Sequence, residues 1–336
     1  MSATSPSRKS DLPLVASVKE TRALTWRRGT PRWHAIAEHG IRATAVVAIL
    51  AIVLIFVFIG MEAIPMFTSK EVRAEVTPSA MWFQQTWGEG PARYAWQPTS
   101  DIPKFSIVPL VMGSLKLTFL AVGIGAPLGI LAAIFTAYVA PKWLREIVKP
   151  TIELLAGVPS VVLGVFALVV MGGYLQRMFG FEHRLNAVLA GSALSLTVIP
   201  LVFTISEDAL TAVPKDFVDA SLALGVTRMH TIFNVVVPAA LPGMAAGVVL
   251  GFGRAIGETM IVLMASGNAA IAKWTLGLST RSITATIAQE MAEVVHGSPH
   301  YVVLFVLGAV LLVFTFITNV IAQRIVESFR RKRGGN

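Results

Sequence analysis

The chain has no cysteine and little charge. The absence of cysteine excludes disulfides, thiolate zinc sites, iron–sulfur clusters and cysteine nucleophiles. Only 14% of its 336 residues are charged, against about 25% in soluble globular proteins. Adding the 27 glycines to the 54% of hydrophobic residues, and removing the 4 tyrosines, makes about 61% of the chain apolar. A soluble domain of this size has too little interior to bury so much apolar surface, so the composition indicates a polytopic membrane protein.

The chain also lacks the motifs of an ATP-hydrolysing or acyl-transferring enzyme. No Gly-x-x-x-x-Gly-Lys-Ser/Thr loop occurs, so a process driven by ATP needs a partner chain that hydrolyses it. His296 and His300 are four residues apart, but Gly297 and Pro299 between them argue against a helical metal pair. We expect no catalytic residue, no metal site and no cofactor in this chain.

Six stretches are long and apolar enough to cross a bilayer, because a hydrocarbon core of about 30 Å needs about 20 apolar residues in a helix. They cover residues 41–64, 109–139, 152–175, 187–206, 243–266 and 301–324. The middle four carry more Gly, Pro, Ser and Thr than the first and last. Small residues let helices approach closely, so we expect an all-α protein with two lipid-facing outer spans and a packed core of four.

The basic residues outside these spans are divided unequally. With the N-terminus in the cytoplasm, 18 of the 28 Lys and Arg fall on the cytoplasmic side and 8 on the other, while Lys116 and Arg254 fall within spans. Cytoplasmic loops carry such an excess, so both termini are expected in the cytoplasm. The net charge of +9 is then mainly a topology signal, not a sign of nucleic-acid binding.

The spans divide the chain into consecutive parts. These are a basic cytoplasmic arm (1–40), the first span (41–64), an external loop (65–108), a core domain (109–325) that contains a cytoplasmic loop (207–243), and a basic tail (326–336). The first apolar run begins too late and is too long for a cleaved signal peptide. Asp11 and Glu20 weaken a mitochondrial transit peptide as the alternative.

The external loop is rich in aromatic residues, which are expected to be interfacial anchors or a small loop core. A docking surface for an external partner is the alternative. The residues are Trp82, Phe83, Trp87, Tyr94 and Trp96.

The cytoplasmic loop 207–243 is too amphipathic for a span and too apolar for a solvated linker. Pro214 restarts a helix, Gly225 ends it, and apolar residues recur at helical spacing on both sides of the glycine. This predicts a helix–turn–helix along the cytoplasmic face, which by itself is an ordinary interfacial hairpin. Glu207 and Asp208 at its start are expected to be solvated.

The spacing in this loop resembles that of ABC importer permeases. In that family Glu-Ala-Ala is followed after three residues by Gly, and after nine more by Ile-x-Leu-Pro. Here Asp219-Ala220-Ser221 is followed at the same spacing by Gly225 and then by three valines and Pro238. The resemblance implies that these residues belong to a coupling helix that docks on a cytoplasmic ATPase.

One arginine lies near the middle of the expected fifth span. Arg254 is about 15–18 Å from either end of residues 243–266 at about 1.5 Å per residue. Glu258 follows after one turn on the same face, with Thr259 beside it. An isolated Arg at this depth costs about 2.5–3.5 kcal/mol on insertion scales. It indicates either a structural ion pair with Glu258 or a path for an oxyanion, which a guanidinium binds bidentately.

Lys116 lies near the external end of the second span. A long basic side chain there is expected to snorkel to the surface, with attraction of substrate as the alternative role.

The residues around Arg254 resemble the signature of phosphate-specific ABC permeases. The stretch is Arg254-Ala255-Ile256-Gly257-Glu258-Thr259-Met260. Residues 152–162 (IELLAGVPSVV) resemble a second family motif, and residues 282–290 (SITATIAQE) resemble the PstC-type subunit more than the PstA-type. The resemblance covers residues 105–325 and implies that Arg254 and Glu258 take part in phosphate passage.

The resemblance implies a type I ABC importer permease of the MetI-like fold, with six spans in the plasma membrane of a bacterium or archaeon. It implies a PstA-type second permease, a PstB-type ATPase dimer that binds ATP and Mg, a PstS-type extracytoplasmic phosphate-binding protein and inorganic phosphate as substrate. Two alternatives remain. One is an importer of another oxyanion or small solute, and the other is a secondary anion transporter, against which the loop spacing and the lack of a clear inverted repeat argue.

Overall fold

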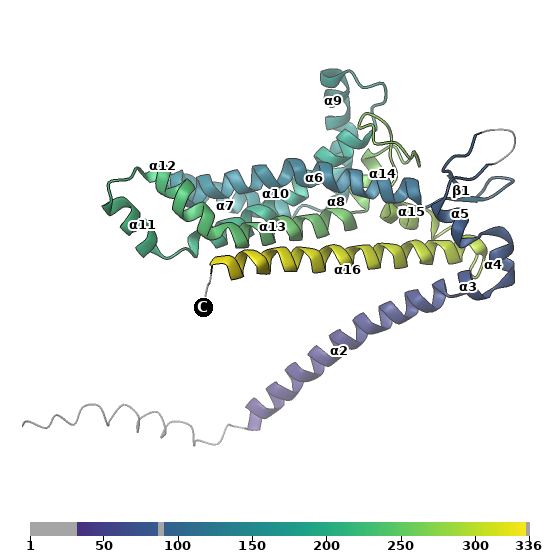
Figure 1. Ribbon diagram of the computed structural model, residues 1–336, viewed down its shortest axis with the longest axis horizontal. Helices are drawn as coiled ribbons and strands as arrows, with labels where there is room; N and C mark the ends of the chain where they lie inside the picture. Colours follow the sequence, from purple (N-terminus) through teal and green to yellow (C-terminus); the bar gives the residue numbers. More distant parts are fainter. Residues whose placement is uncertain (1–31, 87–90, 334–336) are drawn as a thin grey trace, which may run out of the picture. The chain divides into compact units, whose positions relative to one another are not determined.

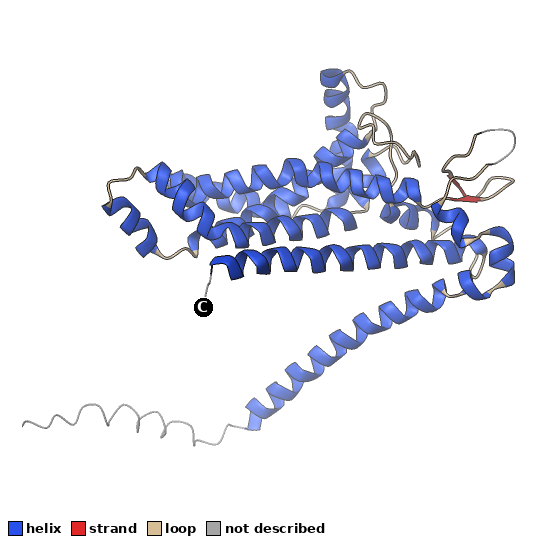
Figure 2. Ribbon diagram, viewed as in Figure 1, coloured by secondary structure: helices blue, strands red, loops and turns tan. Residues whose placement is uncertain are grey.

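The computed structural model describes residues 32–86 and 91–333, which are almost entirely helical (Figure 2). Within these residues six helical runs are long and apolar enough to cross a membrane. They are Ala37–Thr68, Val108–Val139, Ser160–Phe179, Ala187–Thr211, Arg228–Gly257 and Pro299–Ile321. The expected all-α class and the expected number of candidate spans are confirmed.

The chain forms two compact units, Met1–Phe58 and Ile59–Asn336. The described part of the first unit lies in helix α2 (Arg32–Ala63), whose last residues belong to the second unit. Large aliphatic and aromatic side chains fill α2 from Val46 to Phe58. This accounts for a mean hydropathy of 3.0 in the most apolar part of the first candidate span.

The second unit begins with three short helices and a hairpin, followed by the longer helices (Figure 1). Its first elements are α3 (Pro65–Thr68), α4 (Lys70–Glu75), α5 (Pro78–Trp82), β1 (Trp96–Gln97) and β2 (Lys104–Phe105). Then come α6 (Val108–Ile134), the π-helix η1 (Phe135–Val139), α7 (Lys142–Ala156), α8 (Ser160–Phe166), the π-helix η2 (Ala167–Met171) and α9 (Gly172–Phe179). The remainder is α10 (Ala187–Thr211), α11 (Lys215–Ala223), α12 (Arg228–Thr231), the π-helix η3 (Ile232–Val236), α13 (Val237–Gly257), α14 (Met260–Ala265), α15 (Ile283–Glu290) and α16 (Pro299–Arg333).

Helix α10 lies at the centre of this unit and packs against α6, α13, α14 and α7 (Figure 1). Its start is fixed by Asn186, whose side chain accepts a hydrogen bond from the backbone N–H of Leu189 at 3.0 Å. In its most apolar window 61% of the residues are buried, against 44% for the run that begins at Val108. The third and fifth runs reach only 22% and 28%, similar to the 22% of the last. The expected packed core of four spans is therefore centred on two, α6 and α10, within this chain.

The third and fifth spans differ from their expected limits. Residues 152–156 belong to α7, which is amphipathic, and the third span begins only at Ser160 because Gly157 and Pro159 interrupt the helix. The fifth begins at Arg228 and ends at Gly257, whereas residues 243–266 were expected. Within this run Pro238 lies in the first turn of α13 and Pro242 lies inside that helix, and the backbone of Glu258, after the last residue of α13, is extended.

The segment before α6 forms a small core together with residues of α6, α15 and α16. Trp96 is buried there with Met66, Val72, Met81 and Phe105, and β1 pairs antiparallel with β2 with Trp96 opposite Phe105. The loop-core interpretation is confirmed for this tryptophan. Trp82 and Phe83 are exposed, Tyr94 is half-buried, and Trp87 lies outside the described residues.

Helix α6 carries two glycines that test how tightly this unit is packed. A Cβ on Gly113 would lie 2.0 Å from the backbone oxygen of Arg281, whereas a Cβ on the exposed Gly123 would meet nothing within 4 Å. Gly113→Ala is therefore expected to destabilise the protein by about 1–3 kcal/mol or more, because the blocking atom is backbone. Gly123→Ala is expected to cause no loss, because Ala is the better helix former. Thermal unfolding of both variants in detergent checks this, and equal midpoints would contradict the packing.

Candidate functional site

The candidate site lies where α13 ends and α14 begins. Arg254 is in the last turn of α13, and the backbone of Glu258 is extended, with φ −71° and ψ 132°. A carboxylate oxygen of Glu258 accepts a hydrogen bond from the N–H of Met260 at 3.2 Å, so it caps the start of α14. The prediction that Arg254 and Glu258 share one helical face was wrong, because the helix ends between them.

Arg254 is exposed in this chain and makes no ion pair within the part of the chain that the structure describes. In the helical run, which starts at Arg228, Arg254 lies three residues before the end and not near the middle, because the run is shifted toward the N-terminus relative to the expected residues 243–266. Of the two roles inferred from the sequence, the intramolecular ion pair with Glu258 is not present. The guanidinium of Arg254 is therefore available to a group other than Glu258.

The helix break is held in place by α15. Thr284 donates a hydrogen bond to the backbone oxygen of Glu258 at 3.0 Å, and Ser114 of α6 accepts one from the N–H of Ile283 at 3.0 Å. The hydroxyl of Thr259 points back to the backbone oxygen of Gly257 at 3.4 Å. The break between α13 and α14 is therefore held by one hydrogen bond from α15, and the start of α15 is in turn held by α6. Thr284 was not singled out from the sequence, because its partner is a backbone atom 26 residues away.

Lys116 is separate from this break and does not snorkel. Its residue is only 2% exposed, and its ammonium donates to the backbone oxygen of Thr275 at 3.3 Å. The expected exposure was wrong, because the segment between α14 and α15 covers this part of α6 and supplies the carbonyl.

The predicted helix–turn–helix of the 207–243 loop is confirmed. Helix α11 begins after Pro214, and Gly225 has a left-handed φ of +79° that allows the chain to turn into α12. Asp219 and Ala220 are exposed on α11, and the Ser221 hydroxyl lies 2.9 Å from that of Thr231. Pro238 lies in the first turn of α13. We call residues 212–231 the turn segment.

Glu207, at the end of α10, was expected to be solvated, and this was wrong. Its side chain is only 1% exposed, and it accepts from Arg145 at 2.6 Å and from Lys149 at 2.7 Å, both on α7. Asp208 is exposed, as expected.

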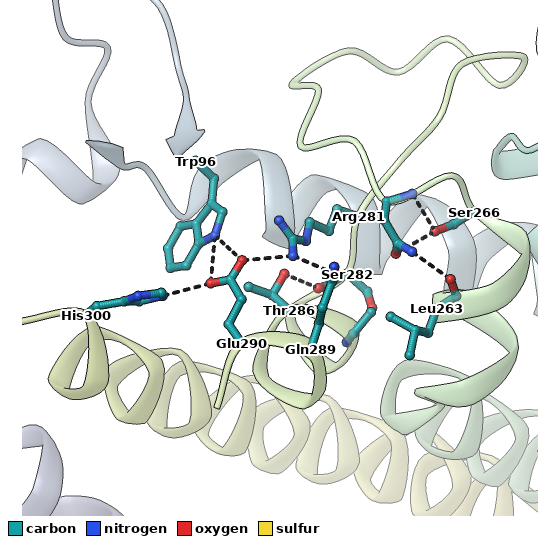
Figure 3. A network of polar contacts seen from close by, with 11 residues as sticks. Trp96, Leu263, Ser266, Arg281, Ser282, Thr286, Gln289, Glu290 and His300 are labelled. Atoms are coloured by element: carbon teal, nitrogen blue, oxygen red, sulfur yellow. Dashed lines mark hydrogen bonds and ion pairs between the residues drawn. The ribbon is translucent and has the colours of Figure 1, made fainter. Parts of the chain in front are cut away.

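A second polar cluster surrounds Glu290 at the end of α15 (Figure 3). One carboxylate oxygen of Glu290 pairs with Arg281 at 2.8 Å, and the other lies 2.8 Å from the imidazole of His300. The indole of Trp96 donates to both oxygens, at 3.0 and 3.2 Å. The cluster joins the hairpin, α15 and α16 beside a cavity of about 620 Å³. No local pattern in the sequence indicates this cluster, because Trp96 and its partner Glu290 are 194 residues apart.

The charge state of Glu290 is set by these neighbours. Burial alone would raise the pKa of its carboxyl, but the hydrogen bonds from His300 and Trp96 and the charge of Arg281 outweigh burial and hold the pKa below its ordinary 4.5. The ionised form therefore stabilises the folded protein above that pH, and the contribution is lost as the pH falls through the lowered pKa.

Glu290→Gln is expected to cost about 1–3 kcal/mol at neutral pH, because it leaves buried donors around Glu290 poorly satisfied. The difference in unfolding midpoint from the unsubstituted protein should narrow as the pH is lowered from about 7 to below the carboxyl pKa. Glu293→Gln removes the same charge from an exposed residue beside the same cavity and serves as the control. A difference in unfolding midpoint that stays constant with pH would contradict an ionised, stabilising Glu290.

Comparisons with known proteins identify the family. The model of the family described as "Binding-protein-dependent transport system inner membrane component" matches residues 125–331. The chain is 35% identical over 293 residues to the probable ABC transporter permease protein YqgH of Bacillus subtilis, covering 87% of this chain and 90% of that protein. It is 31% identical to the phosphate transport system permease protein PstC of Mesorhizobium japonicum, covering 71% and 78%.

A solved structure supports the fold. The permease of the MetNI methionine ABC transporter, in an inward-facing conformation, matches with a TM-score of 0.54 and 18% identity over 66% of this chain and 95% of that chain. At this identity the likeness shows the fold alone, and it confirms the MetI-like fold of type I ABC importer permeases. The chain therefore belongs to the family of inner membrane components of binding-protein-dependent transport systems, and it is a multi-pass plasma-membrane permease subunit of an ABC importer.

Proposed function

We propose that this chain is the PstC-type permease subunit of an ATP-driven importer of inorganic phosphate. The observation that carries the proposal is Arg254, exposed and without an ion-pair partner in the described residues, beside the Glu258 helix break. Relatives named PstC support the choice of phosphate.

The chemistry of Arg254 and Glu258 favours a protonated oxyanion. A guanidinium presents paired donors that match the oxygens of phosphate and compensates its charge. A carboxylate at Glu258 accepts a hydrogen from hydrogen phosphate, whereas fully deprotonated sulfate offers no hydrogen and is repelled. Thr259 adds a hydroxyl next to the carboxylate, whereas Lys116 is buried against the Thr275 carbonyl and takes no part in the proposed site. Binding stays weak, because a transport site must also release its substrate.

The proposed complex contains partners that this chain lacks. A PstA-type second permease completes the path on the exposed side of Arg254, and a PstS-type protein delivers phosphate from outside. A PstB-type ATPase dimer, which holds ATP and Mg, docks on the turn segment in the cytoplasm, with both termini of this chain on the same side. The turn segment offers exposed Phe217, Leu224 and Met229 to such a partner. Closure of the ATPase on ATP then moves the turn segment, and the permease opens toward the loaded binding protein.

Arg254→Gln tests the path assignment directly. The exposed side chain makes no ion pair with any residue that the structure describes, so the variant is expected to assemble normally and to lose phosphate uptake by about tenfold or more. The measurement is uptake of labelled phosphate by proteoliposomes with the whole complex and ATP inside. Arg177→Gln is the matched control, because it removes an exposed arginine that bonds only within its own helix in the described structure.

Three results would overturn the proposal. Intact phosphate uptake by an assembled Arg254→Gln complex rejects the path role. Uptake of sulfate in preference to phosphate, in competition by the unsubstituted complex, favours an importer of another oxyanion. Phosphate transport that persists without any ATPase subunit favours a secondary transporter.

Gly225 tests the docking assignment. Its φ of +79° strains a β-branched residue far more than asparagine. Gly225→Val is expected to weaken co-purification of the ATPase with the permease, and Gly225→Asn to preserve much of it. Co-purification that the valine leaves unchanged would count against ATPase docking on the turn segment.

A further inference from the structure

Glu207 is a buried carboxylate with a cation on each oxygen. Its Oε1 accepts from the guanidinium of Arg145 at 2.6 Å, and its Oε2 accepts from the ammonium of Lys149 at 2.7 Å. Only 1% of its side chain is exposed, while the two cations are 40% and 35% exposed. The carboxylate is therefore taken out of solvent at a cost that the two cations offset, and the cations keep part of their hydration.

Both cations come from one face of α7. Arg145 and Lys149 are four residues apart on this helix and so point the same way, toward α10. The hydrogen bond with Glu207 raises the pKa of Lys149, so its ammonium stays charged. No residue of α7 is fully buried, and Trp143, Ile147 and Leu154 are exposed. The position of α7 against α10 thus depends on the two ion pairs of Glu207, together with the half-buried side chains of Ile152 and Leu155.

The ion pairs lie next to the turn segment. Glu207 is one helical turn before α10 ends at Thr211, and α11 begins at Lys215. In the same turn of α10, the backbone oxygen of Leu210 accepts a hydrogen bond from the hydroxyl of Tyr138 at 2.9 Å. Helix α11 packs against η3 and α12, and it is joined to the end of α10 that holds Glu207 only by the short segment between Thr211 and Lys215.

The other end of α7 leads toward the Glu258 helix break. After Ala156 the chain turns through Pro159 into α8, and α8 packs against α14, the helix whose start Glu258 caps. A continuous set of contacts therefore runs from the turn segment through Glu207, α7, α8 and α14 to the break. These contacts make a mechanical route physically available, and only a measured coupling establishes it.

We propose that Glu207 is a positioning residue, which through Arg145 and Lys149 makes α7 move with the turn segment and so links that segment to the Glu258 break. The inference rests on the proposed function for its motor, the ATPase on the turn segment. The two ion pairs of Glu207 suit this role because their short bonds fix direction as well as distance, whereas the apolar side chains Ile152 and Leu155 of α7 are only half-buried. Contact between α11 and the core remains in place without it, so the ATPase still docks.

The first experiment compares Glu207→Gln with Asp208→Asn in the reconstituted complex. Both remove one negative charge, but only the first residue is buried and paired. Glu207→Gln is expected to leave basal ATP hydrolysis within about twofold and to lower solute imported per ATP by about tenfold. Asp208→Asn is expected to match the unsubstituted complex on both measures. Normal import per ATP by assembled Glu207→Gln would overturn the proposal.

A second experiment separates positioning from folding. The chain has no cysteine, so Lys149→Cys with Glu207→Cys places two unique thiols that a short, reducible bifunctional thiol reagent can join. The unlinked protein is expected to hydrolyse ATP with little import, linkage to restore import per ATP by about tenfold, and reduction of the reagent to abolish it again. Linkage that leaves import per ATP unchanged, or lowers it further, would overturn the proposed connection of α7 to α10 through these two positions. The comparison is made within one purified sample, so a folding defect cancels.

Failure of the proposed phosphate substrate can be distinguished from failure of the proposed role of Glu207. Stimulation of ATP hydrolysis by the loaded binding protein reports coupling whatever solute is carried, so it is measured in every variant beside uptake. An unsubstituted complex that imports no phosphate rejects the proposed substrate. Glu207→Gln that keeps full stimulation and full import of the solute actually carried rejects the role of Glu207.

Discussion

The close approach of α10 to its neighbours is the constraint on which the rest of this unit depends. Glycines lie in the contact of α10 with α6 and in its contact with α13. A Cβ on Gly129 of α6 would lie 2.9 Å from the backbone oxygen of Ile199, one on Gly191 would lie 2.5 Å from Cβ of Leu120, and one on Gly243 of α13 would lie 2.4 Å from Cβ of Ala209. In a membrane, helices gain little from leaving lipid for protein, so such close backbone contact supplies much of the association. It also makes the packed helices respond to a load as units rather than by gradual deformation.

Breaks in the helices lie around this tightly packed centre. The Glu258 break and the turn at Gly157 and Pro159 interrupt runs that hydropathy alone reads as continuous. Free backbone groups at such breaks need partners from the protein. Glu258 supplies one through its carboxylate and receives one from Thr284. The break is thus an ordered element, held by α15 at one atom and by its own side chain at another.

Hydropathy and spacing predicted the fold well, because both depend on neighbours along the chain. The six apolar runs and the turn at Gly225 follow from local composition and from the conformation that only glycine adopts easily. The surroundings of the charged side chains were harder to predict from the sequence. Arg254 and Glu258 were read as one helical face because a helix was assumed to continue, and Glu207 was read as solvated because its partners are 58 and 62 residues away. The prediction that Lys116 is exposed was wrong for the same reason, because its carbonyl partner is 159 residues away.

The polar side chains of this unit differ in how their charge is compensated, and that difference points to function. Glu207 and Glu290 are buried and surrounded by donors from other elements, so their charge is compensated within the chain. Lys116 is buried against a carbonyl. Arg254 alone among these four is exposed and has no ion pair within the described residues, although it lies in an apolar helix. A charged group in such a helix needs water or a polar partner to compensate it. For Arg254 that compensation comes from water or from a group outside the described residues, whereas the other three charges are already compensated by their neighbours.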